Sequence, residues 1–247
     1  MKYIFHIFLI LFTLNVNAQL VEIEWQNTIG SVETDGAKSI IQTSDGGYLI
    51  GGSSYSGIGT DKTEPLLGLQ DCWIIKTDSI GAIEWERTLG GGQNDFVTSI
   101  VESAAGGYLI GAFSNSDTSA NKTEASPGGD YWLIKLDNFG NIEWQNSIGG
   151  NGDDYLTSIN QTIDGGYILC GSSNSAISLD KTENVIGEFD FWIVKINAIG
   201  EIEWQNTIGG DLSDQPQVIY QLNDKGFIVG GFSNSHIAGD KSEDLIG

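Results

Sequence analysis

The side chains of this 247-residue chain that could do chemistry are mainly carboxylates, with 33 Asp and Glu against 11 Lys and Arg and two His. Carboxylates that recur in one loop could bind calcium, which takes six to eight oxygen ligands. The pattern that suggests this is Asp-Lys-Thr-Glu followed by a further Asp. The calcium candidates are Asp61, Glu64, Asp71, Asp180, Glu183 and Asp190.

The alternative for this loop is a turn in which Asp caps backbone N–H groups and Lys pairs with a neighbouring unit. Lys62 lies among the candidate carboxylates, and Asn121 replaces the first Asp in the second copy of the loop. The chain also lacks the Asp-x-Asp-x-Asp-Gly run of a calcium-binding loop. We therefore expect no cofactor, and calcium stays as the alternative.

Catalytic groups are scarce. His6 falls in a leader segment, which leaves His236 alone, and Ser-His-Asp chemistry needs a positioned base. Glycoside hydrolysis needs a pair of carboxylates, and no pair stands out from the repeats described next. The sequence therefore predicts no catalytic residue.

The chain repeats one unit almost four times. A Glu-Trp pair recurs with spacings of 60, 59 and 60 residues, at Trp25, Trp85, Trp144 and Trp204. The predicted bounds are an opening strand over 21–30, units over 35–90, 95–149 and 154–209, and a partial unit over 214–247. Positions that are the same in every unit are explained first by the fold, so the ligand-binding candidates are loop residues that vary between units. These are Tyr55, Leu66, Leu67 and His236.

Each unit predicts four antiparallel strands, expected in the first unit at 39–43, 48–52, 72–76 and 83–89. The middle two are apolar on both faces, and the last alternates between apolar and polar residues. No segment has the apolar spacing of an amphipathic helix. The regular placement of the seven Trp favours packing between units over exposed sugar platforms, and Cys72 and Cys170 are expected as buried free thiols.

A four-stranded unit that is apolar on both faces must stack on copies of itself. We therefore expect an all-β fold, a β-propeller built from four-stranded antiparallel blades of about 60 residues. The segment 21–30 corresponds to a fourth strand without the three before it, and the last unit reaches Gly247 without its third strand. We expect an incomplete fragment of about 3.75 repeats, whose partners include the remaining blades of a longer chain.

The block formed by residues 190–195, Gly200, Trp204, 209–210 and Asp214, together with 225–235, carries an Asp-aromatic-x-x-Lys strand, a Gly turn, a Gly-Gly-x-x-x-Asp link and a Gly-aromatic strand. This block resembles the bacterial seven-bladed β-propeller repeat family, and the resemblance covers residues 20–247. The Ile-Glu-Trp strand and the Asp-Lys-Thr-Glu loop depart from the family's pattern. The resemblance implies an exported or cell-surface protein, and it implies no single activity.

The N-terminus has the features of a secretory signal peptide over residues 1–18, cleaved after Ala18, with the repeats filling 19–247. Its apolar run, Tyr3 to Leu14, is too short to span a bilayer. The net charge of −22 excludes nucleic acid as a partner and argues against an anionic membrane.

We expect a secreted or cell-surface protein that binds or adheres to a glycan or a protein without being an enzyme. The alternatives are an exported polysaccharide-active enzyme or its accessory module, and a structural spacer of a large surface protein.

Overall fold

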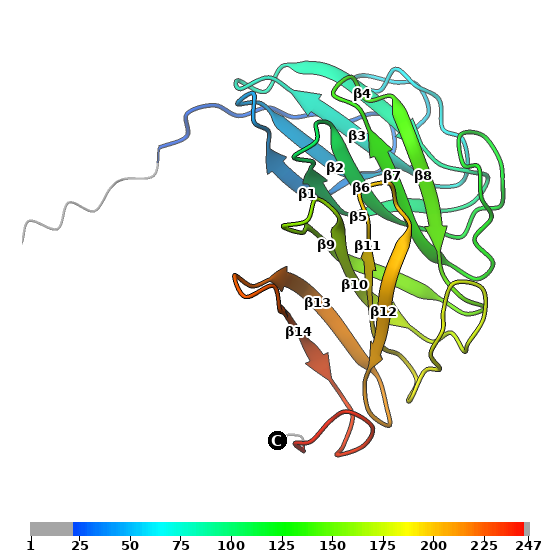
Figure 1. Cartoon of the computed structure of the whole chain (residues 1–247). Helices are drawn as coiled ribbons and strands as arrows, with labels where there is room; N and C mark the ends of the chain where they lie inside the picture. Colours follow the sequence, from blue (N-terminus) through cyan, green and yellow to red (C-terminus); the bar gives the residue numbers. More distant parts are fainter. Residues whose placement is uncertain (1–21, 245–247) are drawn as a thin grey trace, which may run out of the picture.

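Every regular element in the described part of the chain, residues 22–244 of the computed structural model, is a β-strand. The strands form three four-stranded antiparallel sheets and one two-stranded sheet, which follow one another along an open arc (Figure 1). We call these sheets blades 1 to 4. The predicted all-β fold of repeated four-stranded blades, incomplete in its last unit, is confirmed.

Within each sheet the strands lie in chain order, from an inner to an outer strand. Blade 1 contains β1 (Asp35–Gln42), β2 (Tyr48–Ser54), β3 (Asp71–Thr77) and β4 (Ile83–Leu89). Blade 2 contains β5 (Asp95–Glu102), β6 (Tyr108–Ser114), β7 (Asp130–Leu136) and β8 (Ile142–Ile148). Blade 3 contains β9 (Asp154–Gln161), β10 (Tyr167–Ser173), β11 (Asp190–Ile196) and β12 (Ile202–Ile208). Blade 4 contains only β13 (Asp214–Gln221) and β14 (Phe227–Ser233).

The core lies between successive blades, as a repeated unit with two apolar faces requires. Val97 and Ile100 of β5 are buried against Gly51 of β2, where an added Cβ would lie 2.9 Å from Val97. Leu156 and Ile159 of β9 meet Gly111 in the same way. The inner strands β1, β5, β9 and β13 therefore lie next to one another, on the side toward which the arc opens in Figure 1.

The tryptophans pack between blades, as their regular spacing predicts. Trp73, Trp132 and Trp192, on the third strands, are almost completely buried. Trp85 and Trp144, on the outer strands, lie against Gly140 and Gly200 in the turns of the next blade. Cys72 and Cys170 are buried free thiols, also as expected.

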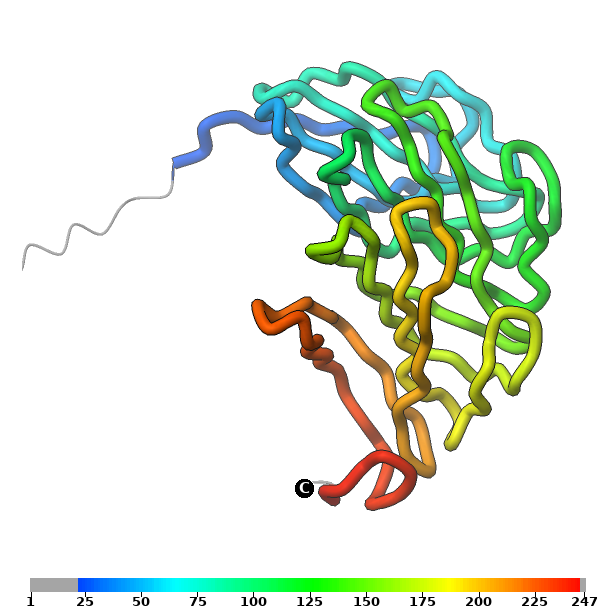
Figure 2. Tube along the Cα trace, viewed as in Figure 1, coloured from blue at the N-terminus to red at the C-terminus, as the bar shows by residue number. Residues whose placement is uncertain are grey.

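The prediction of an outer strand over 21–30 is wrong for the described residues 22–30, which form no strand (Figure 2, at the blue end). These residues nevertheless take the place that β4 takes on blade 2. Trp25 lies against Gly81, and Asn27 donates a hydrogen bond to the Gly81 carbonyl. Among the described strands, none pairs with this segment, so it has no ladder of strand hydrogen bonds. Val21 and the predicted signal peptide over 1–18 lie outside the described residues.

No helix of the described residues has the length and hydrophobicity needed to cross a bilayer.

Candidate functional site

The four inner strands each carry one bulged residue. The register of β1 with β2 skips Lys38, and the corresponding irregularities fall at Thr98, Thr157 and Gln217. A bulge leaves one residue without a cross-strand partner and turns its side chain away from the regular pleat. The bulged residue is Lys, Thr, Thr or Gln in the four strands, so its chemistry varies although the same bulge recurs, unlike the core positions.

Aromatic rings lie beside these bulges on blades 2 and 3. Phe96 of β5 stacks on Phe113 of β6 with ring centroids 5.0 Å apart. Phe113 in turn stacks on Tyr155 of β9 at 4.8 Å, with the two ring planes only 13° apart. Phe113 is buried, whereas Tyr155 keeps 37% of its surface exposed. The ring of Tyr155 also lies near Phe189, with centroids 6.0 Å apart. The result is a short row of rings in which Tyr155 is partly exposed to solvent.

The bulged residues and the aromatic row line one hollow of about 360 Å³, which we call the axial hollow. All four blades contribute to it. Its lining residues are Lys38, Phe96, Thr98, Phe113, Tyr155, Leu156, Thr157 and Gln217. A concave surface with aromatic faces and a few convergent polar groups is the usual composition of a small-molecule or glycan site.

The polar groups of the axial hollow are neutral except for Lys38. The hydroxyl of Thr157 donates to the Cys170 carbonyl at 3.0 Å, and the hydroxyl of Thr98 donates to the Gly111 carbonyl at 3.2 Å. Both hydroxyl oxygens therefore remain available as acceptors. Burial raises the pKa of Tyr155, and the nearby charge of Asp153 adds to this shift, so the phenol keeps its proton and can donate.

The loop residues predicted to bind a ligand lie elsewhere. Tyr55 is half-exposed just beyond β2, and Leu66 and Leu67 are partly buried in the loop before β3. His236 is exposed, with its Nδ1 atom 3.4 Å from a carboxylate oxygen of Asp211. None of these four residues lines the axial hollow.

The six calcium candidates do not converge on one point. Each carboxylate instead accepts hydrogen bonds from backbone N–H groups of its own. Asp61 accepts from Gly30 N at 3.0 Å and Glu64 from Thr88 N at 2.5 Å, while Asp71 accepts from the N–H groups of Leu67 and Gly68. Asp180, Glu183 and Asp190 repeat these bonds in blade 3. Among residues 22–244 no three Asp, Glu, His or Cys side chains are grouped so that they could hold a metal ion. The arrangement is that of a capped turn.

The lysine of this loop behaves differently from the expectation that it pairs with a neighbouring blade. Lys62 is buried and donates to the hydroxyl of Thr88 in its own blade, and Lys181 does the same to Thr207. Lys122 lies 4.9 Å from the ring centre of Trp132. Burial lowers the pKa of Lys122 to about 8. Each lysine therefore locks its loop onto the sheet of the same blade.

The recurrent Asp residues at the start of the inner strands cap backbone N–H groups. Asp95 accepts from Gly91 N at 2.7 Å and Asp154 from Gly150 N at 2.7 Å. Ser116 and Ser175 donate to the same two carboxylates. These carboxylates therefore cap turns at the blade junctions.

The predicted first inner strand begins at Ser39, whereas β1 begins four residues earlier, at Asp35. Lys38 therefore lies outside the predicted strand, and the axial residues are not among the predicted candidates. A usable signal was present, because Lys38, Thr98, Thr157 and Gln217 vary at one repeat position. Positions that vary between units are functional candidates. If this criterion is applied to the strands as well as to the loops, it selects these four residues.

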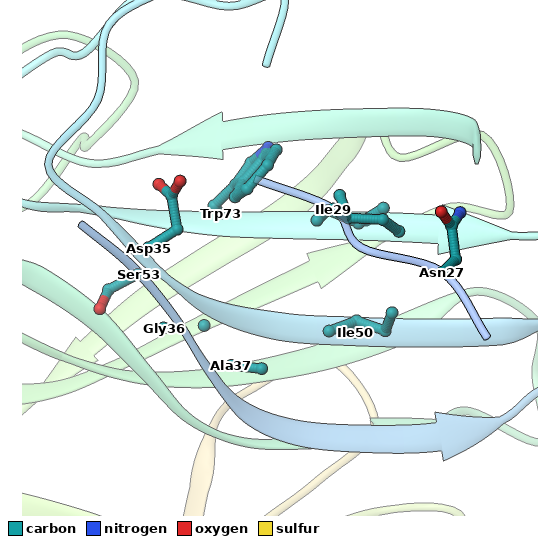
Figure 3. Close-up of a pocket in the computed structure, with 10 residues that line it drawn as sticks. Asn27, Ile29, Asp35, Gly36, Ala37, Ile50, Ser53 and Trp73 are labelled. Carbon is teal, nitrogen blue, oxygen red and sulfur yellow. The ribbon is translucent and has the colours of Figure 1, made fainter. Parts of the chain in front are cut away.

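A second hollow, of about 190 Å³, lies on the face of blade 1 that no other blade covers (Figure 3). It is bordered by Ile29 of the N-terminal segment and by Ile50, Trp73 and Ile75. On blade 2 the corresponding face is covered by Cys72 and Ile74 of β3. Within residues 22–244, no strand covers this hollow in the way that β3 covers the face of blade 2.

Comparison with known proteins gives little information about the function of this chain. No protein-family model matches the chain, and no curated protein matches it. One solved structure, a Bacteroides caccae protein of unknown function, is similar with a TM-score of 0.45 and 10% sequence identity. The match covers 80% of this chain and 54% of that structure, so the chain spans about half of its length.

Proposed function

We propose that this chain is a non-enzymatic binding module of an exported protein and that its axial hollow binds a neutral carbohydrate chain. The observation that carries the proposal is the partly exposed ring of Tyr155, which stacks on Phe113 in a hollow that all four blades line. Aromatic faces stack on the C–H faces of sugar rings, and the surrounding hydroxyl, amide and ammonium groups suit sugar hydroxyls.

Charge supports a neutral ligand over an acidic one. The chain has a net charge of −22, and Lys38 is the single basic side chain in the axial hollow. Acidic polysaccharides and nucleic acids would meet repulsion over most of the surface. A neutral glycan avoids this cost, and it can accept hydrogen bonds from Lys38 and the Gln217 amide.

The N-terminal leader pattern and the resemblance to the seven-bladed propeller repeat family support export and a surface role. A ligand site near the axis is also compatible with further blades, because additional inner strands would extend the same concave surface.

Isothermal titration calorimetry with neutral β-linked and α-linked oligosaccharides tests the proposal. We expect one panel member to bind and Tyr155→Ala to weaken its binding roughly tenfold or more, since hot-spot aromatics carry most of the energy of such contacts. The control is Tyr220→Ala, which removes an aromatic ring that is 54% exposed on β13 and lies outside the axial hollow. Absence of binding across the panel at millimolar sugar, or an equal loss in both variants, contradicts the proposal.

A further inference from the structure

The edge of blade 4 is open at β14. β2, β6 and β10 each pair with an inner strand on one side and with β3, β7 or β11 on the other. β14 pairs with β13 alone among the described strands. The backbone groups along a free edge are a ready template for one more antiparallel strand.

A hollow of about 190 Å³ lies beside this edge, and its lining identifies the side chain that fits it. Phe191, Ile208 and Lys241 contribute to it, together with Gly209, Asp214, Ser233 and Asp240. One repeat earlier the residues equivalent to the first three are Tyr131, Ile148 and Lys181, and they surround Trp192. The Tyr131 and Trp192 ring centroids are 5.0 Å apart, and Lys181 Nζ lies 5.0 Å from the indole. The hollow is therefore an empty tryptophan pocket.

The strand position opposite this pocket also has the small residue that accompanies a tryptophan in the other blades. Trp73, Trp132 and Trp192 lie opposite Gly52, Ala112 and Gly171, which are small residues on the second strands. The equivalent residue of β14 is Gly231. A strand added in the same register would place its Trp opposite Gly231.

A lysine three residues after that tryptophan would lie near an acidic side chain of blade 4. Lys195, opposite Ile168, lies 3.2 Å from Asp164 in the hairpin turn, and Lys76 lies 2.9 Å from Asp45. The equivalent acid in blade 4 is Asp224, which is exposed. One oxygen of Asp224 caps Gly226 N, just as Asp164 caps Gly166 N. The second oxygen of Asp164 carries the lysine contact, so Asp224 can take an incoming lysine.

We propose that the free edge of β14 binds an extended polypeptide segment with the pattern Asp-aromatic-Trp-aliphatic-aliphatic-Lys. The segment pairs antiparallel to β14, its Trp enters the hollow beside Phe191 and Ile208, and its Lys pairs with Asp224. Apolar side chains now in solvent, such as Ile228, which is 56% exposed, would then be partly covered.

The test is binding of a fluorescent synthetic peptide with the sequence of residues 128–137, which contains β7, to the full chain, followed by fluorescence anisotropy. We expect saturable binding, and we expect W132A in the peptide to weaken it roughly tenfold or more. A peptide of scrambled sequence is the control for non-specific hydrophobic association. Equal binding of the scrambled peptide, or no binding at millimolar peptide, overturns the proposal.

A double-mutant cycle locates the site. Asp224→Asn in the protein should weaken binding of the native peptide several-fold but leave binding of the K135A peptide unchanged. Asp117→Asn, an exposed acid in blade 2, is the matched control and should change neither. Hydrogen exchange should show new protection of β14 amides on binding. Protection elsewhere without protection of β14 contradicts the assignment, whatever the affinity.

Discussion

At the scale of single residues, the blade junctions hold acidic side chains under electrostatic strain. Asp130 begins β7, is almost completely buried, and has one carboxylate oxygen without a hydrogen-bond partner. Burial raises the pKa of Asp130 to about 7, and the neighbouring charge of Asp154 adds to this shift. Burial also raises the pKa values of Asp71, Asp154 and Asp190. Asp71, Asp130 and Asp190 begin the third strand of successive blades, so the raised pKa at this position is a property of the repeat.

The raised pKa of Asp130 predicts a pH dependence of stability with a definite sign. The folded state holds a proton on Asp130 up to about pH 7, whereas the unfolded state loses it near pH 3.8. Folding therefore takes up a proton in this window, and stability falls as pH rises from about 4 to 7. Asp130→Asn should reduce this fall by about 3 kcal/mol, measured by urea unfolding at a series of pH values. Asp117→Asn should leave the slope unchanged, and an unchanged slope in Asp130→Asn would show that the proton is not held there.

At the scale of elements, the outer strands β4 and β8 are each held to the next blade by a tryptophan that packs on a glycine turn. Gly200 has φ +89°, and a Cβ added there would lie 2.9 Å from the ring of Trp144. Gly165 has almost the same φ, +87°, and no heavy atom within 4 Å of an added Cβ. The two positions therefore share the backbone requirement for glycine and differ only in the packing above it.

Alanine at these two glycines separates the backbone cost from the packing cost. Gly165→Ala should cost about 1 kcal/mol, because only the positive φ is disfavoured. Gly200→Ala should cost a further 1–3 kcal/mol or so, because the rigid indole of Trp144 must move. Thermal and urea unfolding of both variants provide the measurement. Equal losses would mean that the tryptophan contact contributes little to blade docking.

At the scale of the whole molecule, the arc has unequal ends. Blades 2 and 3 are each packed between two neighbours, whereas blade 4 has two strands and docks on blade 3 alone (Figure 1). The buried cluster at that junction consists of only four residues, Ile168, Cys170, Ile193 and Ile219. In a repeat protein the stability of a unit depends on its interfaces, so blade 4 should open most readily.

Hydrogen exchange under native conditions tests whether blade 4 opens more readily than blade 3. Amides of β13 and β14 should exchange faster than those of β9 to β12, by more than tenfold, since a loss of about 1.4 kcal/mol in local opening free energy already gives that factor. Saturation with the residue 128–137 peptide should slow exchange in β14 selectively. Uniform protection across blades 3 and 4 in the free chain would contradict the prediction.

Much of the architecture follows from the sequence because repeats and strand patterns are local signals. Alternation, glycine turns and the Asp-aromatic-Trp strands locate the elements to within a few residues, and the two apolar faces require stacking. The strand over 83–89 was predicted with its observed bounds. The prediction of a strand over 21–30 is wrong for residues 22–30 because a strand needs a hydrogen-bonded neighbour, and no strand of the described part of the chain pairs with them.

The sequence by itself determined that this protein is all-β, that its units stack, and which tryptophans form the blade interfaces, because each of these depends on residue type at a fixed spacing. Only the tertiary structure decided what lies at the axis and at the ends. Lys38, Phe96, Tyr155 and Gln217 come from four different units, and a register irregularity in each inner strand aims the bulged side chains toward a common hollow. The unfilled tryptophan pocket beside β14 likewise becomes visible only when blade 4 is compared with blade 3. Both depend on contacts between residues far apart in the chain, which spacing alone does not encode.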